Sequence, residues 1–150
     1  MTLAGYDARY AERCATMYQR LFTSPEWGFD WLTLENTRRY FRDLAAAPRF
    51  LGYIYLNGDR PIGCCMGEIS DYFNTTQYTV KEIFIDPPMQ GRGCGSGFLD
   101  EIGRDLKKNK VDNIVLSTSK NIKAYGFYLK NGFAESPDTV FLVKFIDHFG

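Results

Sequence analysis

The feature that most constrains the fold of this chain is a glycine-dense run, Gln90-Gly91-Arg92-Gly93-Cys94-Gly95. An apolar stretch typical of a strand, residues 80–85, precedes the run, and a stretch with helical periodicity, residues 97–108, follows it. Because glycine has no Cβ to block the approach, successive backbone N–H groups of such a turn can point at one anion. The first turn of the helix adds unpaired donors. The sequence therefore predicts a loop that binds a phosphate-bearing ligand.

The spacing of the glycines excludes two familiar phosphate-binding patterns. The dinucleotide pattern G-x-G-x-x-G fails, because no third glycine follows either glycine pair at the required distance. The P-loop pattern fails, because no Gly-Lys-Ser/Thr follows the run. The run does match Gln/Arg-x-x-Gly-x-Gly/Ala, through Gln90, Gly93 and Gly95.

This pattern resembles the acyl-CoA pyrophosphate loop of the GNAT superfamily of N-acetyltransferases. The preceding Ile83-Phe84-Ile85-Asp86-Pro87 is similar to the hydrophobic strand and Asp-Pro that lead into the family's loop. A second family signature is resembled by Asn121, Ala124, Phe127, Tyr128, Lys130, Gly132 and Phe133. The two signatures occur in the family's order, over about residues 79–133.

The resemblance implies an α/β fold of the α+β type in a single domain, residues 1–150. Its centre is a mixed, mostly antiparallel, splayed sheet of about six to seven strands, flanked by about four helices. The periodicity predicts a first amphipathic helix that contains Tyr10 and Leu21, and a second at about 33–46. The sequence pattern also predicts strands at residues 50–56, 61–70, 77–86, 111–117 and 139–146, and the first two are joined across Asn57-Gly58. A further helix, capped by Asn121, carries Tyr128.

Charge and hydropathy limit the partners of the chain. Lys+Arg and Asp+Glu both number 18, and a formal net charge of zero argues against nucleic acid. No apolar run approaches the roughly 20 residues that span a bilayer, and residues 1–20 contain no signal-peptide core. The four cysteines, Cys14, Cys64, Cys65 and Cys94, show no metal spacing, which indicates reduced thiols. We therefore predict a cytoplasmic protein without metal, nucleic acid or membrane, and homodimerisation through the terminal strands remains open.

The resemblance assigns acetyl-CoA largely to backbone groups. In that family the pantetheine arm adds to an exposed strand edge, which here implies the backbones of Ile83 and Ile85. A backbone N–H near Phe84 or Ile85 would stabilise the developing oxyanion. The amides of residues 91–96 would bind the pyrophosphate, with Arg92 as an outer charge. The implied cofactor site also includes Gln90, Gly91, Gly93, Cys94, Gly95, Ser96, Asn121, Phe127 and Lys130.

Acetyl transfer to an amine requires a base for the amine, whose pKa is about 10, and an acid for the departing thiolate. Tyr128 stands at the family's usual acid position, although it could simply pack beside Phe127. Glu82 is the first candidate for the base. Several family members place this glutamate about three residues upstream, on the position of Thr79, so a bulge would be needed to aim Glu82 into the cleft. Glu68 and Asp71 are the alternatives.

The aromatic loop at residues 27–31 lies where the family forms the wall of the acceptor site. Trp27 and Trp31 are therefore candidates for substrate binding. The acidic residues expected near the site would favour a cationic acceptor; they are Glu26, Asp30, Glu68 and Asp71. The loop could instead serve as a hydrophobic staple for the second helix. The resemblance implies an N-acetyltransferase that acetylates a primary amine, of a small molecule, by direct attack in a ternary complex. A protein or peptide amine acetyltransferase and a non-catalytic acyl-CoA sensor are the alternatives.

Overall fold

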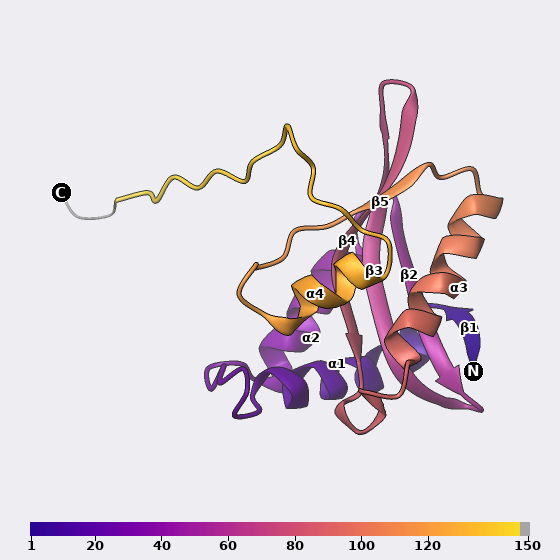
Figure 1. Ribbon diagram of the computed structural model, residues 1–150. Coiled ribbons are helices and arrows are strands. Elements are labelled where there is room, and N and C mark those ends of the chain that lie inside the picture. The colour runs from indigo at the N-terminus through magenta and orange to yellow at the C-terminus, as the bar shows by residue number, and fades with distance from the viewer. Residues whose placement is uncertain (148–150) are drawn as a thin grey trace. The chain divides into compact units, whose positions relative to one another are not determined.

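A computed structural model describes residues 1–147 and contains a five-stranded sheet in the order β1-β2-β3-β4-β5. The sheet is drawn in Figure 1, and neighbouring strands are antiparallel except β4 and β5, which run parallel. The strands are β1 (Thr2–Gly5), β2 (Phe50–Asn57), β3 (Arg60–Tyr72), β4 (Thr75–Ile85) and β5 (Asn113–Val115). The chain divides into two units, residues 1–117 and 118 onward, and the whole sheet lies in the first.

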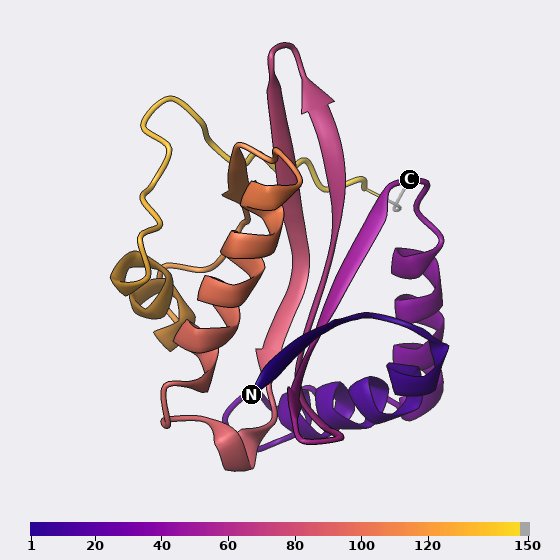
Figure 2. The same cartoon turned by 90° about the vertical axis from the view of Figure 1, so that its right-hand side faces the viewer.

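Three helices of the first unit cover the two faces of the sheet. Helices α1 (Ala8–Phe22) and α2 (Leu34–Ala45) lie on one face, and α3 (Cys94–Lys108) lies on the other (Figure 2). A capping box formed by Thr33 and Asn36 begins α2, and the side chain of Asp7 caps α1. The short 3-10 turn η1 (Pro87–Met89) lies between β4 and α3, and the second unit contains α4 (Lys123–Lys130).

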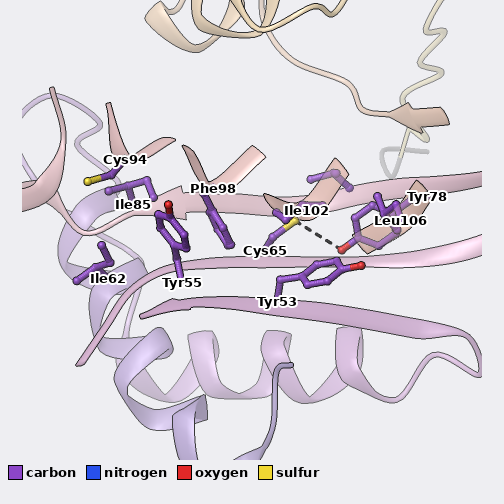
Figure 3. Packing of buried hydrophobic residues seen from close by; sticks show 11 residues of the cluster. Tyr53, Tyr55, Ile62, Cys65, Tyr78, Ile85, Cys94, Phe98, Ile102 and Leu106 are labelled. Atoms are coloured by element: carbon purple, nitrogen blue, oxygen red, sulfur yellow. Dashed lines mark hydrogen bonds between the residues drawn. The ribbon is translucent and has the colours of Figure 1, made fainter. Parts of the chain in front are cut away.

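Two hydrophobic cores pack against the two faces, and adjacent cysteines of β3 divide between them. Cys65 belongs to the core on the α3 side, with Phe98 and Ile102 (Figure 3). Cys64 belongs to the core beneath α1 and α2, with Met17 and Phe41. Successive residues of a strand point to opposite faces. The two thiols therefore face opposite sides of the sheet.

A β-bulge at Lys81 changes the faces of β4. Met66 pairs with Glu82 and Gly67 with Val80, so Lys81 has no partner on β3. Before the bulge, Val80 contributes to the core on the α3 side. After it, Phe84 contributes to the core on the α1/α2 side. With regular alternation, the side chains of Val80, Glu82 and Phe84 would all point to the same face of the sheet. The extra residue at Lys81 therefore turns Glu82 toward α1 and α2.

The sheet is splayed between β4 and β5. The two strands pair only from Gln77 to Thr79, opposite residues 113–115. Along the rest of β4, residues 80–85 have β3 on one side, and no strand of the described residues lies on the other. One edge of this segment is therefore open immediately before the glycine loop, as the predicted fold requires.

The predicted strand count was too high, and several boundaries differ. The sheet has five strands rather than six or seven, and residues 139–146 form no strand, since they have no ladder partner among the described residues. The sequence pattern did not indicate β1. The strand predicted at 111–117 is limited to Asn113–Val115, and α3 begins at Cys94, inside the glycine run. The N-cap of α4 is Ile122 rather than Asn121, whose N–H donates to Ser119 Oγ.

Neither a membrane span nor a metal cluster occurs in the part of the chain that the structure describes. None of the helices in residues 1–147 combines the length and apolarity needed to cross a bilayer. Within the same residues, no three His, Cys, Asp or Glu side chains gather where they could hold an ion.

Candidate active site

The glycine loop presents free backbone donors at the start of α3. Gly91 and Gly93 have φ of 75° and 78°, in the left-handed region that favours glycine, and Gly93 is the N-cap of α3. A Cβ built on either glycine would meet no atom within 4 Å, so the space beside them is open. The N–H groups of residues 91–96 donate to no acceptor among the described residues. Such a row of unpaired N–H groups at a helix N-terminus attracts an anion.

Side chains of the run support the loop rather than fill it. Gln90 Nε2 donates to the carbonyl oxygen of Ile85 at 2.9 Å, which ties the loop to the end of β4. Cys94 is buried in the core on the α3 side. Arg92 is exposed and forms no ion pair with the described residues, so its charge faces solvent beside the loop.

The open edge of β4 offers main-chain groups next to this loop. Asp86 N–H donates to Ile62 O on β3 at 2.7 Å, so the backbone of Asp86 faces β3. Because N–H and C=O groups alternate between the two edges of a strand, those of Ile83 and Ile85 face the open edge. The Ile85 carbonyl is already occupied by Gln90. The N–H of Ile85 and both groups of Ile83 have no partner on that side within residues 1–147.

Glu82 lies beneath α1 and α2, where two tyrosines bind one of its oxygens. Tyr18 OH donates to Oε1 at 2.7 Å and Tyr40 OH donates to the same oxygen at 3.3 Å. Oε2 has no hydrogen-bond partner among the described residues. Burial raises the pKa of the Glu82 carboxyl above its usual value, while the two phenolic hydrogen bonds act to lower it. A carboxylate with one free oxygen and a raised pKa is suited to accept a proton.

The two phenols at Glu82 remain protonated donors at neutral pH. Burial, assisted by the charge of Glu82, raises the pKa of Tyr40 to about 12. Burial also raises the pKa of Tyr18, by more, with the same carboxylate as the second cause. Sequence analysis did not identify either tyrosine. Tyr18 lies within the predicted first helix, and nothing in the sequence indicates that it meets Glu82.

A buried carboxylate fixes the start of the loop to α1. Asp86 is fully buried and receives Arg13 Nη2 at 2.9 Å and Arg20 Nη2 at 2.8 Å, while Arg60 Nη2 lies at 3.8 Å. The sequence indicated Asp86 only as part of an Asp-Pro motif. These ion pairs connect the first helix to the residue that precedes η1, and so help to determine where the loop lies.

The aromatic loop between α1 and α2 forms a row of contacting rings. Trp27 packs against Phe22 with ring centroids 4.9 Å apart, and Phe22 packs against Tyr18 at 4.6 Å. Trp31 stacks on Phe29 at 5.6 Å and is 69% exposed. Trp27 is thus partly a packing residue at the end of α1, and Trp31 offers an exposed aromatic face.

The two alternative carboxylates lie further along the β3–β4 hairpin. Asp71 is opposite Thr76, five residues from Met66, the partner of Glu82, which is roughly 17 Å along a strand. Hydrogen bonds from Thr76 and Arg49 lower the pKa of the Asp71 carboxyl. Glu68 lies 3.7 Å from Lys81 Nζ. The structure therefore does not bring Asp71 together with Glu82.

The remaining predicted residues lie in the second unit. The ring of Tyr128 on α4 contacts Phe127 at 5.5 Å and Phe133 at 5.4 Å. Gly132, with φ of 92°, follows the end of the helix, and Phe133 N–H donates to Tyr128 O at 3.0 Å. Lys130 is exposed in the last turn and Asn121 precedes the helix. The second signature is therefore a short helix, followed directly after its C-cap by a left-handed glycine, that holds the tyrosine between two phenylalanines.

Comparison with known proteins yields one family and many related folds. The family described as "Acetyltransferase (GNAT) domain" matches residues 48–135. Serotonin N-acetyltransferase 2, chloroplastic, of Oryza sativa subsp. japonica is 30% identical over 81 residues, which are 54% of this chain and 38% of that protein. The chain thus spans less than half the length of this relative.

Solved structures share the fold at low sequence identity. A possible acetyltransferase from Clostridium difficile 630 matches with a TM-score of 0.79 and 16% identity, covering 97% of this chain and 98% of the other. The aminoglycoside antibiotic 6'-N-acetyltransferase AAC(6')-IG from Acinetobacter haemolyticus matches with a TM-score of 0.69 and 14% identity, covering 98% and 100%.

Proposed function

The chain belongs to the GNAT acetyltransferase family, and from this we propose that it is an N-acetyltransferase that moves the acetyl group of acetyl-CoA to the primary amine of a small molecule. Direct attack in a ternary complex is the proposed route. We also propose that residues 1–150 work as one N-acetyltransferase domain, because the family match, residues 48–135, extends across both compact units.

Acetyl-CoA fits the groups of the first unit. The unpaired amides of residues 91–96, with open space beside Gly91 and Gly93, would take the pyrophosphate. The unpaired backbone groups of Ile83 and the N–H of Ile85 would take the pantetheine arm as an added strand. When bound, acetyl-CoA supplies an activated thioester carbonyl. The open edge of β4 beside this loop is the single observation that carries the proposal.

Glu82 would remove the proton that blocks attack by the amine. An acceptor amine with a pKa of about 10 is mostly protonated at neutral pH. Glu82 Oε2 is free to accept that proton, while Oε1 is held by Tyr18 and Tyr40. The amine nitrogen then forms the C–N bond and loses its second proton to solvent, and the C–S bond of the thioester breaks.

Tyr128 would return a proton to the departing sulfur. A phenol with a pKa near 10 is a competent donor to a thiolate of pKa about 8.5 once charge develops. Direct attack is favoured over an acyl-cysteine, because all four cysteines are buried. Burial raises the pKa of Cys65 to about 12, which makes it a poor nucleophile.

The names of two matched proteins support a small amine acceptor. One is a serotonin N-acetyltransferase and the other an aminoglycoside 6'-N-acetyltransferase. In this chain, the exposed face of Trp31 and the row of rings that leads from it offer a surface suited to cationic or flat amines.

The test is thiol release from acetyl-CoA with a panel of aryl-alkyl amines, polyamines, aminoglycosides and peptide N-termini. We expect turnover with small amines, and a Glu82→Gln variant that binds CoA normally by calorimetry but loses at least about a hundredfold in kcat/KM. Turnover with peptides alone would replace the small-molecule acceptor by a peptide. Binding of acetyl-CoA without turnover of any amine would identify a sensor instead.

A further inference from the structure

A pocket of about 500 Å³ lies between α1, α2 and the start of β2, apart from the groups assigned to acetyl transfer. Every residue that lines it belongs to the first unit. The lining includes neither Glu82 and its two tyrosines nor the glycine loop. Protein interiors leave few voids larger than a water molecule, and pockets of roughly 300–1,000 Å³ hold small ligands. The pocket is therefore a candidate binding site of its own.

Small side chains on both helices leave this space open. Ala8, Ala11 and Ala15 recur at the spacing of one face of α1, and all three line the pocket. Ala45 lines it from the last turn of α2. Because an alanine side chain ends at Cβ, the two helix faces leave a hollow that longer apolar side chains would fill.

Aromatic rings form the rest of the apolar lining. Phe41 lines the pocket from α2, while Tyr6 and Phe50 line it with their ring centroids 5.6 Å apart in an edge-to-face arrangement. A Cβ on Gly52 would lie 2.7 Å from both Phe50 Cζ and Tyr6 Cβ, so glycine at this position lets the two rings come together. Aromatic edges and faces pack well against the flat ring of a ligand. The lining therefore suits an aromatic body.

The charged residues of the lining leave one cation unmatched within residues 1–147. Glu12 accepts a hydrogen bond from Arg38 Nε at 2.9 Å, and Asp7 accepts one from Arg9 Nε at 3.1 Å. Arg42 lines the pocket but forms no ion pair or hydrogen bond with the described residues. A guanidinium presents a planar fork that fits a carboxylate through two parallel hydrogen bonds. An anion-binding group therefore stands beside an apolar cavity.

We infer that this pocket binds a small aromatic carboxylate, with the ring between the alanines and the aromatic side chains and the carboxylate on Arg42. The charge distinguishes this ligand from the proposed acceptor, because a cationic amine would be repelled by the unmatched guanidinium. The hydroxyl of Tyr6 has no hydrogen-bond partner among the described residues, so it adds a donor to the lining. The site requires no part of the second unit and does not depend on acetyl transfer.

The experiment titrates the full-length chain with cinnamate, an aromatic monocarboxylate, by calorimetry and by amide chemical shifts in NMR. We expect one binding event per chain, with the largest shifts at residues 6–15 and 38–50. The Kd should be the same with and without coenzyme A, because the two sites share no residue. Cinnamamide has the same shape without the charge, and it should bind about tenfold more weakly.

Three variants test the residues that define the pocket. Arg42→Gln removes the cation, so it should weaken the binding of cinnamate about tenfold and leave that of cinnamamide unchanged. Arg39→Gln is the matched control, because Arg39 lies on the same helix outside the lining and also lacks an ion pair within residues 1–147. Ala11→Leu should abolish binding by filling the pocket, with an unchanged circular dichroism spectrum, because leucine favours helices.

Four results would overturn the inference. One is the absence of both heat and shifts at millimolar cinnamate. Another is a set of shifts centred on residues 82–96, which would place the ligand in the acetyl-CoA site. Equal affinity for cinnamate and cinnamamide would mean that the carboxylate is not recognised. An equal loss of affinity in the two arginine variants would mean that the net charge of the chain, rather than Arg42, attracts the ligand.

Discussion

The hydrogen bond from Tyr18 to Glu82 should set the pH at which the proposed base becomes active. Burial raises the pKa of this carboxyl, and the two tyrosine hydroxyls lower it by binding the ionised form. Tyr18→Phe removes the shorter of the two bonds, 2.7 Å against 3.3 Å for Tyr40, and leaves the ring in place. The carboxylate is then less well stabilised, so the pKa must rise and Glu82 must lose its proton at a higher pH.

The size of the effect follows from the strength of the bond. A hydrogen bond to a charged group contributes about 1.5–3 kcal/mol, and about 1.4 kcal/mol changes a protonation equilibrium tenfold. We expect the lower end of this range, because Tyr40 still donates to Oε1. At a pH where Glu82 is mostly protonated, kcat/KM should therefore fall about tenfold, and at high pH it should approach the wild-type value.

The assay is the pH profile of kcat/KM for acetyl transfer to one amine, measured for wild type, Tyr18→Phe and Tyr40→Phe. The acid limb should move to higher pH in both variants, further for Tyr18→Phe. Tyr10→Phe is the matched control, because this tyrosine lies on the same helix without a hydrogen bond to Glu82. If the acid limb of Tyr18→Phe coincided with that of wild type, Glu82 would not be the group that titrates.

Three further predictions concern the loop and the second unit. Gly93→Ala forces a side chain into the left-handed region and into the open space, so the Kd for CoA from calorimetry should rise at least about fivefold. Gly103→Ala, within α3, is its control and should bind CoA normally, with a raised melting temperature. Asp86→Asn removes the buried negative charge that Arg13 and Arg20 bind. It should therefore lower the free energy of unfolding in urea by about 3 kcal/mol. Tyr128→Phe should reduce kcat about a hundredfold while calorimetry shows unchanged binding of CoA.

Elements with local signals could be predicted from the sequence. The hairpin across Asn57-Gly58 and the helices of the first unit follow from turn chemistry and periodicity, which depend on neighbouring residues. The glycine loop follows from its spacing for the same reason. The family resemblance was confirmed, because its two signatures also consist of short local patterns.

Elements that depend on a distant partner were the ones predicted poorly. β1 has only four residues, and it is a strand because Thr2–Gly5 pairs with residues 53–56. Residues 139–146 have the opposite character, since their sequence favours a strand but they have no ladder partner among the described residues. Strand propensity reports how well a residue fits a sheet, and it does not report whether a sheet edge is available.

The orientation of Glu82 shows how a conflict within a sequence pattern can itself indicate structure. Regular alternation would place Glu82 with Val80 in the apolar core on the α3 side, where an ionised carboxylate would have no partner. The bulge at Lys81 removes this conflict by turning the carboxylate toward Tyr18 and Tyr40. Gly67 permits the bulge, because a Cβ there would lie 2.3 Å from the carbonyl oxygen of Thr79. A glutamate at a core position of a strand, with a glycine on the strand before it, therefore argues for a bulge, although only the structure identifies the tyrosines that receive the carboxylate.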